Sequence, residues 1–328
     1  MDFLVSYHQN NIGIVRKQFE QYDKSFKIIK ELSDDLSFAS SELNIDKISE
    51  LTQTNRIYLI RHIAKIDKFF NIDDNINDYL INNINKDLSF SFQILFDTNK
   101  ICNEFMHKAC EYLQAQDYIL DVKNSEQIIS LAYIDNKLHI GFGNSKTNLS
   151  KYKCGKVHYA KDDLYISRSE YKLLEAVNTF NIDLNKCYKA IDAGAAPGGW
   201  SKLLANHNIK VSAIDPANLD KRLDNNKNIK HYQETIQQFI NSNNDTNYDL
   251  LVNDMKMDPR KSIELISRLK NNLEINGLVI ITFKLGERYN LRYLDSLLEI
   301  FKKEFNILHV RQLFHNRNEL TVIGRKNK

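Results

Sequence analysis

The sequence lacks several features that would place it in a special class of protein. Its 4 cysteines form no CxxC pair and no spacing typical of a disulfide framework, so we expect reduced thiols and a cytoplasmic location. No apolar run approaches the roughly 18–20 residues of a membrane span. The first residues lack the basic start and apolar stretch of a signal peptide, and no repeat of fixed period occurs. We therefore expect no membrane partner.

The composition is that of an ordinary globular protein. Hydrophobic residues make up 42% and charged residues 27% of 328 residues, which is enough chain for two domains. The formal net charge of +3 is unevenly spread, because residues 1–150 carry 16 basic and 21 acidic side chains, and residues 151–328 carry 29 and 21. A basic C-terminal half fits a polyanionic partner. The N-terminal half gives no electrostatic support for one.

Patterns typical of strands and helices alternate from about residue 169 onward. This alternation implies parallel βαβ units in a doubly wound α/β sheet, closed by an antiparallel hairpin formed by the last two strands. Ser169 is expected to cap the first helix. The expected strands are 188–194, 211–215, 229–232, 250–254, 278–283, 307–314 and 320–324. The expected helices are 169–180, 199–207, one through Phe239, 262–273 and 291–305.

The first half is less regular. We expect an α+β domain over residues 1–155, followed by the doubly wound domain over residues 156–328. A strand is predicted at 90–96 and a helix at 100–113, and before residue 55 only mixed α and β structure is indicated. The strands 128–134 and 137–142 read as a hairpin that turns at Asp135-Asn136. The polar stretch 144–161 is the predicted linker.

A glycine-containing loop, Gly194 to Trp200, follows a predicted strand and opens a predicted helix. It departs from the dinucleotide pattern GxGxxG because Ala196 replaces the second glycine. Pro197 also removes a backbone N–H that a pyrophosphate would bind. We therefore predict a nucleoside ligand without phosphates, of which S-adenosylmethionine is the common one; the alternative is a simple tight turn. Asp215 ends the next strand, where a carboxylate can accept hydrogen bonds from an adenosine ribose.

Four charged residues lie at element ends that should face one crevice. Lys172 belongs to the helix before the loop, Asp254 and Lys284 end strands, and Glu319 begins the last strand. Because parallel strands open at one edge of the sheet, we expect the four to meet there. A lysine whose pKa is lowered by burial or by a second cation can deprotonate a hydroxyl group. The alternatives are a solvated Lys172, a helix-capping Asp254 and a surface Glu319.

With these motifs the sequence resembles the FtsJ/RrmJ ribose 2'-O-methyltransferases. Within that family it is most similar to the RlmM group, which acts on 23S rRNA. Five stretches carry the likeness: 167–173, 191–200, 253–255, 283–285 and 311–319. The resemblance implies a Rossmann-like class I methyltransferase domain, S-adenosylmethionine as cofactor, and RNA, in particular 23S rRNA, as partner. It implies no structural metal, and DNA is not an expected partner.

The resemblance also implies roles for single residues. The family's Lys-Asp-Lys-Glu tetrad falls on Lys172, Asp254, Lys284 and Glu319, with Lys284 as the proton acceptor. The implied cofactor contacts are Ser169, Gly194, Ala196, Pro197, Gly198, Gly199, Trp200, Asp215 and Asp254. An acidic residue often holds the adenine in the family, but Thr235 stands here with Glu234 beside it, so that contact stays open. Ile60-Arg61-His62-Ile63 and the strand 90–96 are similar to a recognition region that includes a THUMP-like module, which implies that residues 1–155 recognise RNA.

Other methyl acceptors would leave other signs in the sequence. Methylation of an exocyclic amine is usually marked by an Asn-Pro-Pro-Tyr-like motif, where this chain has Asn253-Asp254-Met255-Lys256. Cytosine C5 chemistry needs a cysteine, and none lies near the expected crevice. A ribose methyltransferase that acts on tRNA or on a cap would use the same tetrad and stays open. A non-catalytic RNA-binding or ribosome-assembly factor also stays an alternative, although such a factor is expected to lose tetrad members.

Overall fold

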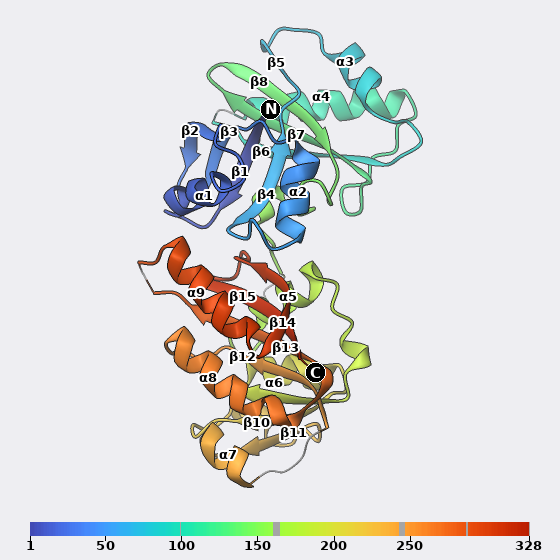
Figure 1. Cartoon of the computed structure of the whole chain (residues 1–328). Coiled ribbons are helices and arrows are strands. Elements are labelled where there is room, and N and C mark those ends of the chain that lie inside the picture. The colour runs from blue at the N-terminus through green and yellow to red at the C-terminus, as the bar shows by residue number, and fades with distance from the viewer. Residues whose placement is uncertain (99, 160–164, 243–246, 287, 328) are drawn as a thin grey trace. The chain divides into compact units, whose positions relative to one another are not determined.

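The computed structural model describes residues 1–98, 100–159, 165–242, 247–286 and 288–327. The chain divides into two compact units, Met1–Val157 and His158–Lys328 (Figure 1). Within the described ranges, no helix has both the length and the apolar composition to cross a membrane.

The C-terminal unit is built on a seven-stranded sheet with the order β11-β10-β9-β12-β13-β15-β14. Its strands are β9 (Lys189–Ala193), β10 (Lys210–Ile214), β11 (Ile229–Tyr232), β12 (Tyr248–Asn253), β13 (Leu273–Lys284), β14 (Phe305–Arg311) and β15 (Glu319–Lys326). Strands β9 to β13 pair in parallel, and β15 runs antiparallel to both β13 and β14. The predicted class I methyltransferase fold, with its terminal hairpin, is confirmed.

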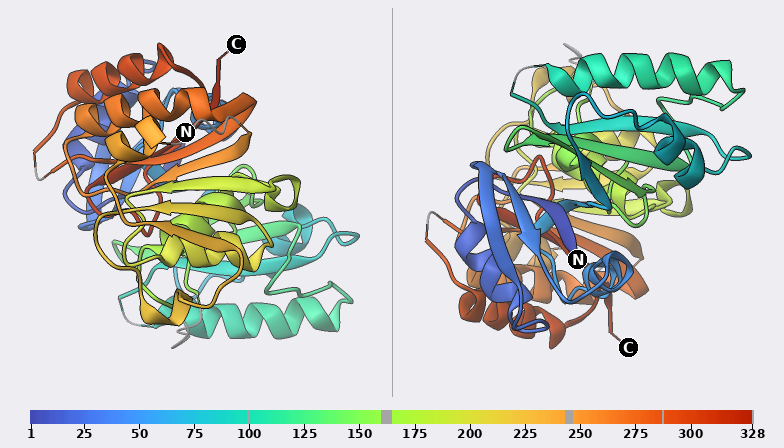
Figure 2. Two further views of the ribbon diagram at one scale, coloured as in Figure 1. Left: turned by 90° about the horizontal axis from the view of Figure 1, so that it is seen from below. Right: turned by 90° about the horizontal axis from the view of Figure 1, so that it is seen from above.

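Helices cover both faces of this sheet. They are α5 (Glu170–Thr179), α6 (Gly199–Asn206), α7 (Ile236–Ser242), α8 (Pro259–Leu269) and α9 (Leu291–Lys302), with short 3-10 turns η2 (Leu184–Lys186), η3 (Lys221–Leu223) and η4 (Lys270–Asn272). Helices α5 and α6 pack together on one side, and α7, α8 and α9 on the other (Figure 2, left). The central strands between them are buried on both faces along their inner segments, such as Leu250-Leu251-Val252 and Leu278-Val279-Ile280-Ile281, and these segments are apolar.

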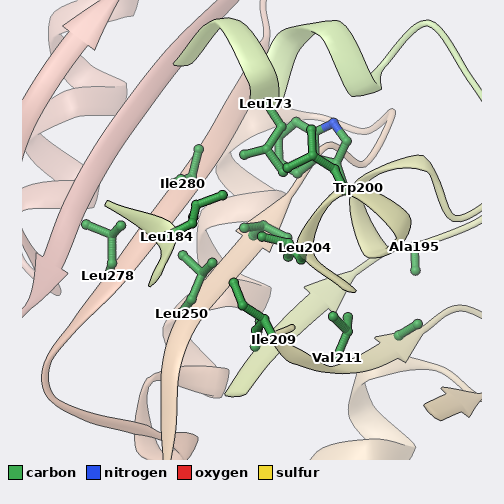
Figure 3. Packing of buried hydrophobic residues seen from close by; sticks show 14 of the residues in the cluster. Leu173, Leu184, Ala195, Trp200, Leu204, Ile209, Val211, Leu250, Leu278 and Ile280 are labelled. Atoms are coloured by element: carbon green, nitrogen blue, oxygen red, sulfur yellow. The ribbon is translucent and has the colours of Figure 1, made fainter. Parts of the chain in front are cut away.

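One core cluster joins the glycine-loop helix to the sheet (Figure 3). Trp200 and Leu204 of α6 pack with Leu173 of α5 and with Leu250 and Ile280 of the central strands. Each of these side chains is at most 3% exposed. The two helices that begin beside the loop are therefore fixed against the strands that end beside it.

The ends of one predicted helix and one predicted strand in this unit differ from the structure, and one predicted cap lacks its side-chain bond. The helix expected to run to residue 273 ends at Leu269, because Leu273 pairs with Tyr248 as the first residue of β13. The strand expected to reach residue 314 ends at Arg311, because the carboxylate of Glu175 accepts the N–H groups of the residues that would continue it. Ser169 is the N-cap of α5 but makes no side-chain cap bond.

The N-terminal unit contains two four-stranded sheets. The first has the order β2-β3-β1-β4 and is antiparallel; the second has the order β5-β8-β7-β6, with β6 and β7 parallel. The strands are β1 (Asp2–Tyr7), β2 (Lys27–Ser33), β3 (Leu36–Ser40), β4 (Ile60–Lys65), β5 (Lys68–Phe70), β6 (Phe90–Phe96), β7 (Gln127–Ile134) and β8 (Lys137–Gly143). The helices are α1 (Ile12–Phe19), α2 (Ile45–Gln53), α3 (Asn77–Asn83) and α4 (Ile101–Ala115), with a 3-10 turn η1 (Lys153–Gly155). Asp135 and Asn136 both have positive φ, as the predicted hairpin turn requires.

The stretch expected to be a linker is largely part of the N-terminal unit. Asn148 is 2% exposed and Cys154 is 4% exposed, and the Cys154 carbonyl accepts a hydrogen bond from Ser6 of β1. A side chain at Gly155 would collide with Arg61 of β4. Polar composition misled the prediction here, because these residues are fixed by backbone contacts. Residues 160 and 161 of the expected linker lie outside the described residues.

Candidate active site

The glycine loop turns sharply between β9 and α6. Gly194 and Gly198 have φ values of 76° and 106°, a region that favours glycine. A Cβ on Gly194 would lie 2.1 Å from Cγ of Met255, and one on Gly198 would lie 2.4 Å from a methyl group of Leu223. Both glycines are therefore required by conformation and by close packing.

The backbone N–H groups of the loop donate hydrogen bonds within the loop and to neighbouring residues. The N–H groups of Gly194 and Ala195 donate to the Ile214 carbonyl at 2.9 and 3.2 Å, and that of Gly198 donates to Ala195 at 2.6 Å. The N–H of Ala196 donates to the Asp215 carboxylate at 3.0 Å. Because Pro197 has no N–H, no donor from residue 194 to residue 198 is left for a phosphate. This arrangement supports the prediction of a ligand without a pyrophosphate.

One side chain joins the segment before α5 to the glycine loop, and a second side chain holds the segment itself. The indole N–H of Trp200 donates to the Ser169 carbonyl at 2.7 Å. The buried carboxylate of Glu170 accepts the N–H groups of Ile166 and Ser167. The hydroxyls of Ser167 and Ser169 lie 2.6 Å apart. The Trp200 side chain is itself in the core (Figure 3), so its predicted contact with the cofactor would have to come from its backbone.

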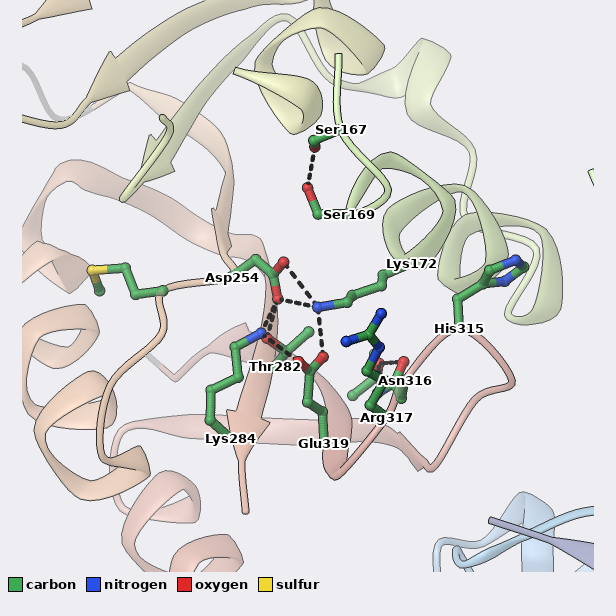
Figure 4. A network of polar contacts seen from close by, with 12 residues as sticks. Ser167, Ser169, Lys172, Asp254, Thr282, Lys284, His315, Asn316, Arg317 and Glu319 are labelled. Atoms are coloured by element: carbon green, nitrogen blue, oxygen red, sulfur yellow. Dashed lines mark hydrogen bonds and ion pairs between the residues drawn. The ribbon is translucent and has the colours of Figure 1, made fainter. Parts of the chain in front are cut away.

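Lys172, Asp254, Lys284 and Glu319 converge at the carboxyl edge of the parallel strands (Figure 4). The ammonium of Lys172 lies 3.2 Å from both oxygens of Asp254 and 2.7 Å from Glu319. The ammonium of Lys284 contacts Asp254 and lies 3.1 Å from Glu319. Each lysine thus touches both carboxylates. The register of β13 and β15, which pairs Lys284 with Glu319, accounts for one side of this ring.

The pKa values of the two lysines in this ring of four residues shift in opposite directions. All four side chains are only 14–15% exposed, so the surroundings disfavour charge. Burial and the neighbouring Lys172 together lower the pKa of Lys284, despite the two carboxylates. For Lys172 burial also acts downward, but Asp254 and Glu319 outweigh it and raise its pKa. Of the two, Lys284 is the one that gives up its proton more easily.

A third carboxylate lies beneath the loop. Asp192 of β9 is 2% exposed and accepts a hydrogen bond from the Ser201 hydroxyl at 2.7 Å. Burial, with contributions from Asp254 and Asp215, raises the pKa of Asp192 to about 7. Asp215, whose carboxylate accepts the Ala196 N–H of the loop, takes no part in the ion pairs of the tetrad, and an acidic group in this position favours a cationic ligand over an anionic one. The sulfonium and ammonium groups of S-adenosylmethionine fit that requirement.

The remaining predicted residues occupy less decisive positions. Asp215 follows β10 directly, and its carboxylate also accepts the N–H of Ala217 at 2.8 Å. The Thr235 hydroxyl bonds to the Gln238 side chain, and the adenine contact stays open. In the part of the chain that the structure describes, no group of three or more His, Cys, Asp or Glu is arranged to hold a metal ion.

The sequence interpretation missed three residues that hold the site. Thr282 is 1% exposed, and its hydroxyl donates to the Asp254 carboxylate. Glu175 fixes the segment that leads to Glu319, through the N–H groups of Phe314 and His315. Glu170 was detectable, because Ser167 and Glu170 have the spacing of a capping box. No comparable local signal marks Thr282 or Glu175, since their partners lie 28 and about 140 residues away.

Comparison with known proteins places this geometry in a family. Residues 165–313 match the family model of the FtsJ-like methyltransferases. An uncharacterized protein of Methanocaldococcus jannaschii is 30% identical over 49% of this chain and 47% of its own length. Two proteins named ribosomal RNA large subunit methyltransferase M, from Psychromonas ingrahamii and Shewanella denitrificans, are 26% and 30% identical. They align with 85% and 69% of this chain and with 82% and 66% of their own lengths.

Solved structures are less similar. A putative hemolysin from Streptococcus thermophilus aligns with a TM-score of 0.44 at 17% identity, over 52% of this chain and 70% of its own. That likeness is too low to carry an argument. The family match covers the glycine loop, Lys172, Asp254 and Lys284, and the strand order is that of a class I methyltransferase. Over residues 165–313 the C-terminal unit therefore matches the FtsJ-like methyltransferases, and the chain is a methyltransferase that uses S-adenosylmethionine.

Proposed function

We propose that this chain methylates a ribose 2'-hydroxyl of RNA, and that the RNA is 23S rRNA. The proteins named ribosomal RNA large subunit methyltransferase M support the substrate, since one of them aligns with 97% of this chain at 26% identity. The observation that carries the reaction type is the ring of Lys172, Asp254, Lys284 and Glu319. A ribose hydroxyl is a weak acid, and a buried lysine with a lowered pKa is suited to take its proton.

Lys284 acts as the general base in this proposal. In its neutral form, its Nζ accepts the proton of the 2'-hydroxyl as the oxygen becomes nucleophilic. Asp254 and Glu319 then stabilise the new ammonium, because both carboxylates already contact that atom. Lys172 remains protonated between the same two carboxylates. Its charge opposes protonation of Lys284 and so increases the neutral fraction of the base.

The cofactor supplies the methyl group, and residues of the loop edge would hold it. Asp215 is placed for the ribose hydroxyls, and the backbone from Gly194 to Gly199 for the remainder, with Ser169, Trp200 and Asp254 as further contacts.

The N-terminal unit, in this proposal, selects the RNA. Support comes from the aligned length, because matches over 85% and 97% of this chain must include much of residues 1–157. Its excess of acidic side chains argues against binding of RNA by electrostatic attraction alone. We therefore expect recognition of RNA shape or of unpaired bases, which needs fewer phosphate contacts.

The test is a map of 2'-O-methyl sites in total RNA from cells with and without the gene. We expect one site in 23S rRNA to disappear and to return with the intact gene but not with Lys284→Ala. If the lost site lies in tRNA or at a cap, ribose methylation is supported but 23S rRNA is not the substrate. An unchanged map would reject ribose methylation, and restoration by Lys284→Ala would reject the base.

A further inference from the structure

The segment between β14 and β15, residues 312–318, is held rigidly beside the tetrad. The carboxylate of Glu175 accepts the N–H groups of Phe314 and His315, each at 2.8 Å, and the His315 ring nitrogen lies 2.7 Å from it. The carbonyl of Asn318 accepts the N–H of Leu285 at 2.8 Å. This segment therefore has a fixed backbone on both sides of residue 317.

Two further contacts complete the frame. The Asn316 side chain is 1% exposed and donates to the Thr321 hydroxyl at 2.8 Å. The Gln312 side chain donates to the carbonyl of Arg317 itself at 3.3 Å. Residue 317 is thus anchored through its own backbone, and the position of its Cα is set before any substrate arrives.

The side chain of Arg317 contrasts with this fixed backbone. It is exposed, and among the residues that the structure describes its guanidinium makes no hydrogen bond or ion pair. Figure 4 shows it directed toward the tetrad, from the segment that leads to Glu319. An unpaired arginine on a rigid backbone loses little backbone entropy when it binds a ligand.

The charges nearby leave Arg317 uncompensated. In the tetrad two ammonium groups face two carboxylates, and each lysine contacts both. When both lysines are protonated, the four charges cancel among themselves, and the guanidinium of Arg317 belongs to none of these ion pairs. A polyanionic substrate that reaches Lys284 would meet this charge first at the rim of the site.

The position of the 2'-hydroxyl in RNA indicates which phosphate Arg317 would meet. In RNA, the 2'-oxygen and the 3'-oxygen sit on adjacent ribose carbons, so the nearest phosphate to the reacting oxygen is the one on its 3' side. A guanidinium binds phosphate through two parallel N–H···O bonds, which fixes orientation as well as position. We infer that Arg317 binds the phosphodiester on the 3' side of the methylated ribose. This inference rests on the proposed ribose methylation.

The first test measures RNA binding by Arg317→Ala with unmodified, in vitro transcribed 23S rRNA. We expect KM for RNA to rise about tenfold or more, because one phosphate contact is lost. The slope of log affinity against log salt should fall by about 1, while cofactor binding by calorimetry stays unchanged. Arg268→Ala is the matched control: it removes an equal charge at the far end of α8, where Arg268 is exposed and pairs with Glu264. An equal effect in both variants would overturn the inference.

The second test replaces the phosphate instead of the arginine. A short RNA around the mapped site is made with a neutral methylphosphonate on the 3' side of the target ribose, or on its 5' side as control. We expect the 3' substitution to slow the wild-type enzyme and to make Arg317→Ala no worse than wild type. If Arg317→Ala loses a further tenfold on the 3' analogue, the arginine does not bind that phosphate. If the wild-type enzyme methylates no ribose at all, the proposed function fails instead.

Discussion

The two units of this protein differ in how far the charged side chains of their ion pairs are buried. In the N-terminal unit, each ion pair among the described residues keeps its basic side chain at least 37% exposed; those of Lys30 and Lys47, for example, are 46% and 47% exposed. In the C-terminal unit four charged side chains are gathered at 14–15% exposure. Exposed pairs contribute little to stability, and buried ones require desolvation that their attraction barely offsets. The buried ring is therefore expected to contribute little to stability, which agrees with the chemical role proposed for it.

Where the N-terminal unit does bury a titratable group, neutral partners satisfy it or the group stays uncharged. Burial opposes the ionisation of Asp23, but hydrogen bonds from Ser25, Ser41 and the Glu42 N–H outweigh it and bring its pKa to about 2. Burial lowers the pKa of His62 to about 4, so its ring is neutral near pH 7. Neither residue gathers a second charge as the tetrad does.

The largest effect should come from Lys284→Arg. The substitution keeps the positive charge between Asp254 and Glu319, but an arginine does not deprotonate in proteins and cannot accept a proton. We expect kcat to fall about 10²–10⁴-fold, the usual contribution of a general base. Cofactor binding by calorimetry should change little. A variant that keeps more than a tenth of the wild-type kcat would contradict the assignment.

Lys172→Met should shift the pH dependence of the remaining activity. Lys284 must be neutral to act, so kcat rises with pH through the pKa of Lys284. That pKa is lowered by burial and by Lys172, and loss of Lys172 also leaves both carboxylates to Lys284 alone. Both changes raise the pKa, so the rising limb should move to higher pH. Single-turnover rates across pH would show this, and a limb that stays in place would remove Lys172 from the tuning of the base.

Asp192→Asn tests the cost of a buried carboxylate outside the tetrad. Its pKa is about 7 in the folded protein against 3.8 as the reference value, so the unfolded chain loses this proton first as pH rises. The free energy of unfolding should therefore fall between about pH 4 and pH 7 on account of this group. Asparagine removes the titration and keeps an acceptor for Ser201. Urea unfolding without cofactor at pH 5 and pH 7.5 should show a smaller pH difference in the variant, and an equal difference would contradict the raised pKa.

The sequence was sufficient for the strands and for the members of the tetrad, for a physical reason. Strand β12 contains the apolar run Leu250-Leu251-Val252, and polar residues that closely follow such a run emerge at one edge of the sheet, as Asp254 does. The limits of the prediction have an equally plain cause. The hydrogen bonds of Glu175 join positions about 140 residues apart, and only the folded chain brings them together. The polar segment near Cys154 was taken for a linker because its contacts are made by backbone groups, which composition does not reveal.

Thr282→Val removes one donor to the tetrad at nearly constant volume. The Thr282 hydroxyl donates to the Asp254 oxygen that Lys284 also contacts. Without it Asp254 should orient Lys284 less well, and we expect kcat to fall about tenfold, as for a hydrogen bond to a charged group. Since Thr282 does not reach the reacting atoms, KM for the cofactor should stay near the wild-type value. Thr282→Ser, which keeps the hydroxyl, should restore most of kcat. Equal loss in both variants would point to packing.

Lys47→Ala should have the smallest effect, and it tests an exposed ion pair of the N-terminal unit against the buried tetrad. Lys47 pairs with Glu50 at 2.9 Å, one turn apart on α2, with both side chains about half exposed. Water already solvates both groups, so we expect a change of less than about 0.5 kcal/mol in the free energy of unfolding, further reduced by salt. Activity should not change. A loss above about 1 kcal/mol in urea unfolding would show that surface pairs of the N-terminal unit do carry stability, and the buried ring could then no longer be distinguished from them on energetic grounds.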